Sequence, residues 1–332
     1  MAPPQLLRGP ARPAPTAALS GDALRGHLLA PVELAESLGL DFLLVAQRWW
    51  GTGLEIEAST YDCLAMTAFY AAHTSRLKLI TAIHPGFMLP AAVAKWGATI
   101  DRLTGGRWAV NVTSGWHEEE FTMYGASLIP HDDRYARSAE FIQVLRGAWG
   151  GGPFSFHGRY YNVDGLRLEP RPSASLEIFQ GGQSDAAVAM AGEQSDWMFL
   201  NGGPVEKVAG IIERARAAAT ANGRTLRFAL YSIPVCRTSD AEAQSVVDGM
   251  VAAIDHDRVA ARRARVSGAE GMWAPSPDPL TTIDSNEGFA SRLVGSPETI
   301  IAKIREFQAV GVDCFHVALN DHMFNSQVIR QL

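Results

Sequence analysis

Residues 101–116 read DRLTGGRWAVNVTSGW and join a helix end, a strand and a polar loop in one stretch. The two glycines follow the helix, because glycine reaches the positive φ of a helix cap without steric cost. The apolar strand over 108–112 then carries Asn111, Thr113 and Ser114 to its carboxyl end, where parallel α/β folds bind ligands. The stretch therefore predicts a parallel α/β fold with a site at this polar cluster, and an ordinary strand followed by a polar loop is the alternative.

The same alternation of apolar strands and helices recurs along the chain. We expect strands near 41–46, 77–83, 108–112, 176–180, 197–200, 226–236 and 313–319, and helices near 31–38, 59–72, 90–103, 133–149, 184–192, 205–221, 240–265 and 296–311. Repeated βα units predict a parallel sheet, and about eight of them close into a barrel. The expected fold is therefore α/β, a (β/α)8 TIM barrel with an irregular or missing first strand and insertions at its C-terminal mouth. An open doubly wound sheet is the alternative, but no dinucleotide-binding glycine motif follows the first strand.

The chain reads as one barrel domain over residues 21–332, preceded by an irregular Pro- and Ala-rich segment at 1–20. Two segments interrupt the alternation of strands and helices. Residues 150–171, with closely spaced aromatic residues and glycines, predict a small β-excursion. The Gly- and Pro-rich residues 268–288 predict a mobile lid-like loop, because such loops at barrel mouths often gate solvent.

Composition limits the classes of function. The 332 residues are 47% hydrophobic and 19% charged, with a net charge of −6 and a pI near 5.9. The absence of a basic tract argues against nucleic acid, and no apolar run reaches the ~18 residues that span a membrane. Three widely separated cysteines fit neither a disulfide framework nor a metal site. We therefore expect a soluble cytoplasmic protein that holds no metal.

A second candidate site is the run FQGGQS at 179–184. Two glycines between a strand and a helix start present unpaired backbone N–H groups to an anion, as in the phosphate sites of barrels. Ser184 would be both helix N-cap and phosphate ligand, and Arg134 and Tyr135 could reach the same phosphate. Asp185 counts against this interpretation, because a carboxylate in the first turn competes for the same positive potential. A plain strand–turn–helix is the alternative.

The chain shows no evident catalytic nucleophile. It has no nucleophile elbow, Walker loop or zinc-protease motif. His84 follows a strand and should lie at the barrel mouth, and His316 on the last strand could face inward. A barrel with a phosphate site and aromatic loops, but without a nucleophile, suits an enzyme whose reactive group is supplied by a cofactor.

Several phrases, in this order, resemble the bacterial-luciferase-like flavin-dependent monooxygenases. They are ATIDRLTGGR at 98–107, NVTSGW at 111–116, HDDRY at 131–135, EIFQGG at 177–182 and LVGSP at 293–297. The FQGG phrase and the DW pair at 196–197 are nearest to the dimethylsulfone and alkanesulfonate monooxygenase branch. Such proteins are commonly homodimers or homotetramers.

The resemblance implies a two-component enzyme that takes reduced FMN (FMNH2) from a separate NAD(P)H:flavin reductase and reacts it with O2. The flavin peroxide so formed would oxygenate a small organosulfur compound or a neutral secondary metabolite. A deazaflavin-dependent oxidoreductase of the same fold and a non-catalytic, degenerate flavin-binding barrel remain alternatives.

The resemblance also assigns residues by position. Asn111, near the reacting edge of the isoalloxazine, and His84 are the expected catalytic residues. The expected cofactor-binding residues are Ala82, Asn111, Thr113, Ser114, Tyr135, Gly182, Gln183 and Ser184. The strand end at Ala82 often carries a non-proline cis peptide bond in such proteins. The expected substrate pocket is lined by Trp49, Trp50, Phe87, Trp116, Tyr231 and Arg292.

The expected pocket departs from that of sulfonate-cleaving relatives. They place an arginine and a histidine where Tyr231 and Ile233 align, and Arg292 is not in register with their lid arginine. Since a buried anion requires cationic partners, a neutral or larger apolar substrate is expected.

Overall fold

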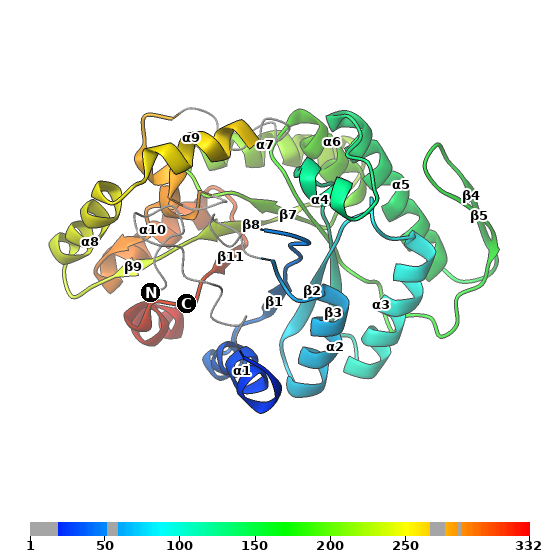
Figure 1. Ribbon diagram of the computed structural model, residues 1–332, viewed down its shortest axis with the longest axis horizontal. Coiled ribbons are helices and arrows are strands. Elements are labelled where there is room, and N and C mark those ends of the chain that lie inside the picture. The colour runs from blue at the N-terminus through cyan, green and yellow to red at the C-terminus, as the bar shows by residue number, and fades with distance from the viewer. Residues whose placement is uncertain (1–18, 52–58, 266–275, 284–286) are drawn as a thin grey trace.

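A curled sheet of seven parallel strands, with helices packed outside it, forms the centre of the computed structural model (Figure 1). The structure describes residues 19–51, 59–265, 276–283 and 287–332. The strands are β1 (Phe42–Val45), β2 (Lys78–Ile83), β3 (Trp108–Val112), β6 (Ile178–Gly181), β7 (Trp197–Leu200), β8 (Arg227–Ser232) and β11 (Cys314–Val317), and they are hydrogen-bonded in this order. The expected α/β barrel fold is confirmed. The irregular or missing first strand was expected within 1–20, and residues 1–18 lie outside the described residues.

Helices connect successive strands and cover the outside of the sheet (Figure 1). They are α1 (Gly21–Leu38), α2 (Cys63–His73), α3 (Pro90–Thr104), α4 (Glu118–Met123), α5 (His131–Trp149), α6 (Asp185–Gln194), α7 (Val205–Ala221), α8 (Asp240–Ala252), α9 (His256–Arg265) and α10 (Pro297–Ala309). Within residues 150–171, β4 (Phe154–His157) and β5 (Asn162–Leu166) form an antiparallel hairpin. A second small sheet pairs β9 (Val235–Cys236) with β10 (Val294–Gly295).

Three expected elements are wrong in their boundaries. Pro31 lies inside α1 instead of opening it, and the helix begins ten residues earlier, at Gly21. The expected strand at 226–236 splits into β8 and β9, because Pro234 between them has no N–H to continue the ladder. The expected helix at 240–265 splits into α8 and α9, and the carboxylate of Asp255 accepts a hydrogen bond from the Arg258 N–H (3.1 Å) at the start of α9.

Two further expectations concern the barrel mouth. The one cis peptide bond within the described residues is Glu169–Pro170, so the non-proline cis bond expected beside Ala82 is absent there. Of the expected lid-like loop at 268–288, the structure describes 276–283 and 287–288. Asp278 in this part pairs with Arg292 at 2.9 Å.

The interior of the barrel is filled in layers. Because barrel strands are tilted, side chains at one height come from alternate strands. The strand registers place Phe42, Ala109, Trp197 and Cys314 in one layer, Ile80, Phe179 and Ala229 in the next, and then Leu44, Asn111, Phe199 and His316. The rings of Phe179 and Trp197 are stacked, with centroids 5.2 Å apart, and Phe179 also stacks on Phe199 at 5.3 Å. These aromatic contacts fill part of the lumen below the third layer.

The amino end of the barrel is sealed by charges that satisfy one another. The half-buried carboxylate of Glu177 pairs with Lys78 and Arg227 and accepts a hydrogen bond from the Trp197 indole at 3.0 Å. Burial alone would raise the pKa of Glu177, but the hydrogen bonds from Lys78 and Trp197 outweigh it and lower that pKa. The Arg227 guanidinium also lies 4.1 Å from the centroid of the Trp197 ring.

Candidate functional site

A cavity of about 240 Å³ opens at the carboxyl end of the barrel. Its floor is the third interior layer, defined above by Leu44, Asn111, Phe199 and His316. The wall brings together many of the residues that the sequence singled out, namely Thr113, Ser114, Trp116, Tyr135, Gly182, Gln183 and Tyr231, together with His131, Arg134 and Asn201.

Asn111 provides an unsatisfied polar atom on this floor. Its side chain is 8% exposed, and its amide nitrogen donates a long hydrogen bond to Thr113 Oγ1 at 3.4 Å. Its Oδ1 is buried without a hydrogen-bond partner. A buried polar atom without a partner is unfavourable, so Asn111 is suited to a ligand that supplies the missing hydrogen bond.

The loop after β6 forms a narrow cradle against α5. Gly182 has φ +122°, and a Cβ there would lie 2.5 Å from the Tyr135 hydroxyl and 2.9 Å from the Ala187 Cβ. A Cβ at Gly181, by contrast, would meet nothing within 4 Å. Glycine is therefore required at 182 for the backbone to approach Tyr135, while Gly181 leaves open space in the cavity.

The cradle has the properties of an anion site. Ser184 caps α6 by accepting a hydrogen bond from the Ala187 N–H at 3.3 Å, and the Gln183 Nε2, on the cavity side, is buried without a partner. The side chain of Asp185 is 95% exposed and pairs with Arg214 at 2.6 Å. Its carboxylate points towards Arg214 and away from the cradle, so it does not compete with an anion for the N-terminus of α6. The helix N-terminus and the Gln183 amide therefore present donors to one place.

Three expected site residues lie outside this cavity, in an aromatic cluster beside it. The Trp49 ring lies 4.7 Å from Phe87 and 6.4 Å from His84, and Trp49 also contacts Tyr124 at 5.0 Å. Burial, with a smaller effect of the Arg48 charge, lowers the pKa of His84 to about 4, so its ring is neutral near pH 7. The Nδ1 atom of His84 is buried without a hydrogen-bond partner.

A buried ion pair ties two loops of the mouth together. The Arg48 guanidinium lies 3.0 Å from the Glu120 carboxylate, which also accepts a hydrogen bond from the Trp50 N–H at 3.1 Å. The Arg48 guanidinium lies 4.6 Å from the Trp116 ring centroid. Trp50 lies outside the cavity lining, and its ring stacks on His117 at 6.4 Å, the residue next to the cavity-lining Trp116.

The remaining expected residues have other positions. Ala82 lies one layer above the floor, on the strand next to Asn111, and its side chain is buried. The Arg292 side chain is 55% exposed, is engaged with Asp278 and lies outside the lining of the cavity. Ser114 is bonded to the buried Ser138 hydroxyl at 2.9 Å, which fixes its loop on α5.

Sequence reasoning missed Leu44 and Phe199, and it left His316 unassigned. The strands that carry Leu44 and Phe199 are apolar on both faces, so no alternation marks which side chains face inward. The sequence did indicate that His316 shares a face of the last strand with Cys314, because the two residues are two positions apart on it.

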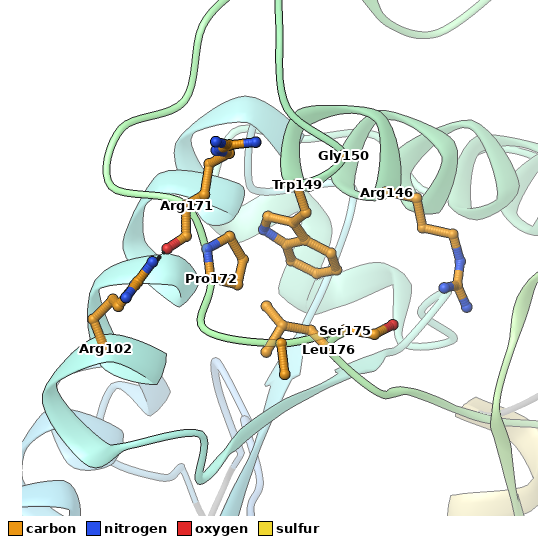
Figure 2. A pocket seen from close by; sticks show the side chains of 9 residues that line it. Arg102, Arg146, Trp149, Gly150, Arg171, Pro172, Ser175 and Leu176 are labelled. Atoms are coloured by element: carbon orange, nitrogen blue, oxygen red, sulfur yellow. Dashed lines mark hydrogen bonds between the residues drawn. The ribbon is translucent and has the colours of Figure 1, made fainter.

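A second hollow, of about 470 Å³, lies outside the barrel near the amino end of β6, between α3, α5 and residues 171–176 (Figure 2). Its three arginine side chains point in different directions (Figure 2). The Arg102 Nε donates to the Arg171 carbonyl at 2.7 Å, and Arg146 donates to the Asp196 carboxylate at 3.0 Å. The three guanidinium groups do not converge on one position where an anion could bind, so this hollow is not the candidate site.

In the ranges that the structure describes, no group of three His, Cys, Asp or Glu side chains could hold a metal ion. No helix in the same ranges is long and apolar enough to cross a membrane.

Comparisons with known proteins agree with this architecture. Residues 11–314 match the model of the luciferase-like monooxygenases. The FMNH2-dependent dimethylsulfone monooxygenase of Pseudomonas fluorescens (strain Pf0-1) is 39% identical over 290 residues, which are 85% of this chain and 78% of that protein. Two solved structures share the fold at 20% identity. One is a riboflavin lyase (TM-score 0.77, 92% of this chain and 83% of that chain), and the other is DmoA from Hyphomicrobium sulfonivorans (TM-score 0.76, 95% and 83%). The chain belongs to the luciferase-like monooxygenase family.

Proposed function

We propose that this protein is the oxygenase component of an FMNH2-dependent monooxygenase and that its substrate is a small, neutral organosulfur compound. The observation that carries the proposal is one cavity with unsatisfied polar atoms at two places, Gln183 Nε2 in the α6 cradle and Asn111 Oδ1 on the floor. A ligand with an anionic end and a polar ring, such as FMN, supplies partners to both.

The residues present fit such a cofactor. Gly182, Gln183 and Tyr135 would hold the phosphate, with Ser184 at the N-cap of α6 next to them, and Thr113, Ser114 and Ala82 would flank the ring beside Asn111. Bound reduced FMN would supply the electrons that activate O2. The chain itself would orient the two reactants and exclude water, which the apolar floor residues Leu44 and Phe199 favour. His84, neutral and partnerless at Nδ1, would act from the aromatic cluster as a hydrogen-bonding group.

The lining supports a neutral substrate. Away from the α6 cradle and from His131 and Arg134 at the start of α5, the lining residues Leu44, Phe199, Tyr231 and His316 carry no formal charge, because burial lowers the pKa of His316 to about 4. A sulfonate would lose its hydration there without gaining a counter-ion. The dimethylsulfone specificity in the name of the relative from Pseudomonas fluorescens makes a dialkyl sulfone the first substrate to test.

The proposal includes a partner and a compartment. A separate NAD(P)H:flavin reductase would supply FMNH2, since the chain has no dinucleotide-binding glycine motif. Three free cysteines suit a cytoplasmic location. We also infer that residues 21–332 form one barrel domain and that the protein is a homodimer or homotetramer. Trp49, Trp50, Phe87 and Trp116 would shape access of the substrate, and the pairing of Arg292 with Asp278 would fix the segment at the barrel mouth.

The test combines the purified chain with a flavin reductase, NADH, FMN and dimethyl sulfone under ¹⁸O2. Product carrying one ¹⁸O atom, formed only when reductase and oxygen are both present, supports the proposal. Oxygen-independent hydride transfer from a reduced deazaflavin would instead identify an oxidoreductase. Weak flavin binding without substrate-dependent oxygen consumption would identify a non-catalytic, degenerate barrel.

A further inference from the structure

His316 occupies a defined place on the cavity floor. It lies on β11 directly opposite Tyr231 of β8, and its ring centroid is 5.0 Å from Tyr231 and 5.7 Å from Phe199. His316 is partly buried and lines three hollows, one of which is the cavity described above. His316 is therefore packed by aromatic neighbours but open towards the cavity.

The imidazole of His316 has unused hydrogen-bonding capacity. Burial lowers its pKa to about 4, so near pH 7 it is neutral and carries one N–H donor and one acceptor nitrogen. Within the described residues, its ring contacts those of Phe199 and Tyr231 and makes no hydrogen bond to protein. A donor that lines a cavity and has no hydrogen bond to the described residues is available to a ligand there.

The position of His316 places this donor across the floor from Asn111. β3 and β11 are four strands apart in the order of the seven-stranded curled sheet, so Asn111 and His316 reach the cavity floor from different sides. The two other members of that layer, Leu44 and Phe199, are apolar. The floor therefore presents two polar groups that face each other across an apolar surface.

We propose that His316 is a substrate-binding residue that donates a hydrogen bond to a neutral oxygen of the substrate, such as a sulfone oxygen. The inference rests on the proposed function. The anion-binding donors lie with β6, α6 and α5, near Asn111, so the cofactor is expected on that side. The side of the cavity formed by Tyr231, Phe199 and His316 is then left for a small neutral molecule, whose alkyl groups would pack against the aromatic rings.

Two variants and a matched control test this role. His316→Phe keeps a ring against Tyr231 and Phe199 but removes the N–H, and His316→Asn restores a shorter donor. Cys314→Ala changes a side chain on the same face of β11, two interior layers lower and outside the cavity lining. The measurements are KM for dimethyl sulfone in the reductase-coupled assay, Kd for FMN by fluorescence quenching, and the melting temperature.

We expect His316→Phe to raise KM for the sulfone about tenfold, the effect of one lost hydrogen bond, with Kd for FMN within about twofold of wild type. His316→Asn should recover part of the loss, and Cys314→Ala should match wild type. With dimethyl sulfide, which lacks the oxygen, wild type and His316→Phe should give the same KM.

Other results would overturn the assignment. An unchanged sulfone KM in His316→Phe would show that the residue does not bind substrate, and a weaker Kd for FMN with unchanged KM would assign it to the cofactor. If wild type oxygenates no sulfone, the proposed function fails by itself. Sulfone binding to wild type and His316→Phe, followed by saturation-transfer NMR, then decides the role of His316 separately: weaker binding to the variant supports it, and equal binding or no binding to wild type rejects it.

Discussion

The two ends of the barrel are made from the same strands but treat their polar groups in opposite ways. At the amino end, Glu177 is satisfied by Lys78, Arg227 and the Trp197 indole. At the carboxyl end, Asn111 Oδ1 and Gln183 Nε2 are buried without partners. Beside a cavity, unsatisfied atoms are kept where stability is exchanged for binding, so the difference separates the stabilising Glu177 cluster from the functional cavity.

The largest effect is expected from closing the cradle. Gly182→Ala would place a Cβ 2.5 Å from the Tyr135 hydroxyl at a φ of +122°, so Tyr135 or the loop must move. We expect FMN affinity, measured by fluorescence quenching, to fall at least ~100-fold. Gly223→Ala, which also has a positive φ but open space around it, is the control for backbone strain and should bind FMN normally.

Asn111→Leu should separate activity from stability. The variant keeps the approximate volume but removes the unsatisfied oxygen, so the free energy of unfolding should rise by up to ~1 kcal/mol. Oxygenation, measured as kcat/KM, should fall about 100-fold, because a hydrogen bond to the reacting centre is lost. A variant that is both less active and less stable would show that Asn111 serves the fold.

A substitution at the amino end should lower stability without changing FMN binding. Glu177→Gln leaves Lys78 and Arg227 without their counter-charge, and these partners are partly exposed. We therefore expect a loss of only about 2 kcal/mol in the free energy of unfolding, measured by urea denaturation. FMN affinity should stay unchanged. A large loss of FMN binding in a stably folded Glu177→Gln would contradict the separation of the two ends.

The neutral histidines predict an acid-sensitive stability. The pKa values of His84 and His316 are lowered from 6.5 to about 4, so the unfolded chain binds protons first as pH falls. The contribution of each neutral histidine to the free energy of unfolding is fully present above pH 6.5. It is lost progressively down to about pH 4, by about 1.4 kcal/mol per pH unit for each histidine. Urea denaturation of wild type and His316→Phe between pH 7 and 5 should show the smaller slope in the variant.

The smallest effect is expected from Asp185→Asn. The carboxylate is exposed and turned towards Arg214, so its removal should change the free energy of unfolding by less than ~0.5 kcal/mol. FMN affinity should rise less than threefold, because a distant, solvated charge is screened. A tenfold rise would mean that Asp185 faces the cradle in solution.

The strand at 108–112 and the helices at 90–104 and 205–221 were predictable because length, glycine caps and apolar spacing agree there. Boundaries failed at Pro31 and around Pro234, where the rule that proline opens or ends an element competes with packing. The polar loops after β3 and β6 were predictable as one site, since carboxyl ends of parallel strands share an edge.

What the sequence could not reveal is which of the mouth residues face inward. Trp49, His84 and Phe87 follow strand ends, as expected, yet their loops direct them into the neighbouring aromatic cluster. Leu44 and Phe199 line the cavity although nothing distinguishes them from other apolar strand residues. Those orientations depend on strand tilt and loop geometry, which composition and spacing do not record.

The Arg48–Glu120 pair has a consequence for how such enzymes diversify. The aromatic cluster is carried by the loops after β1 and β2 and by α4, whereas the cradle for the anionic group belongs to β6, α6 and α5. Mutations that remodel the cluster can therefore accumulate while the cradle keeps its shape, provided that the loop after β1 stays anchored to α4. New substrate ranges could thus evolve on an inherited means of holding the cofactor, and directed evolution should aim at the cluster first.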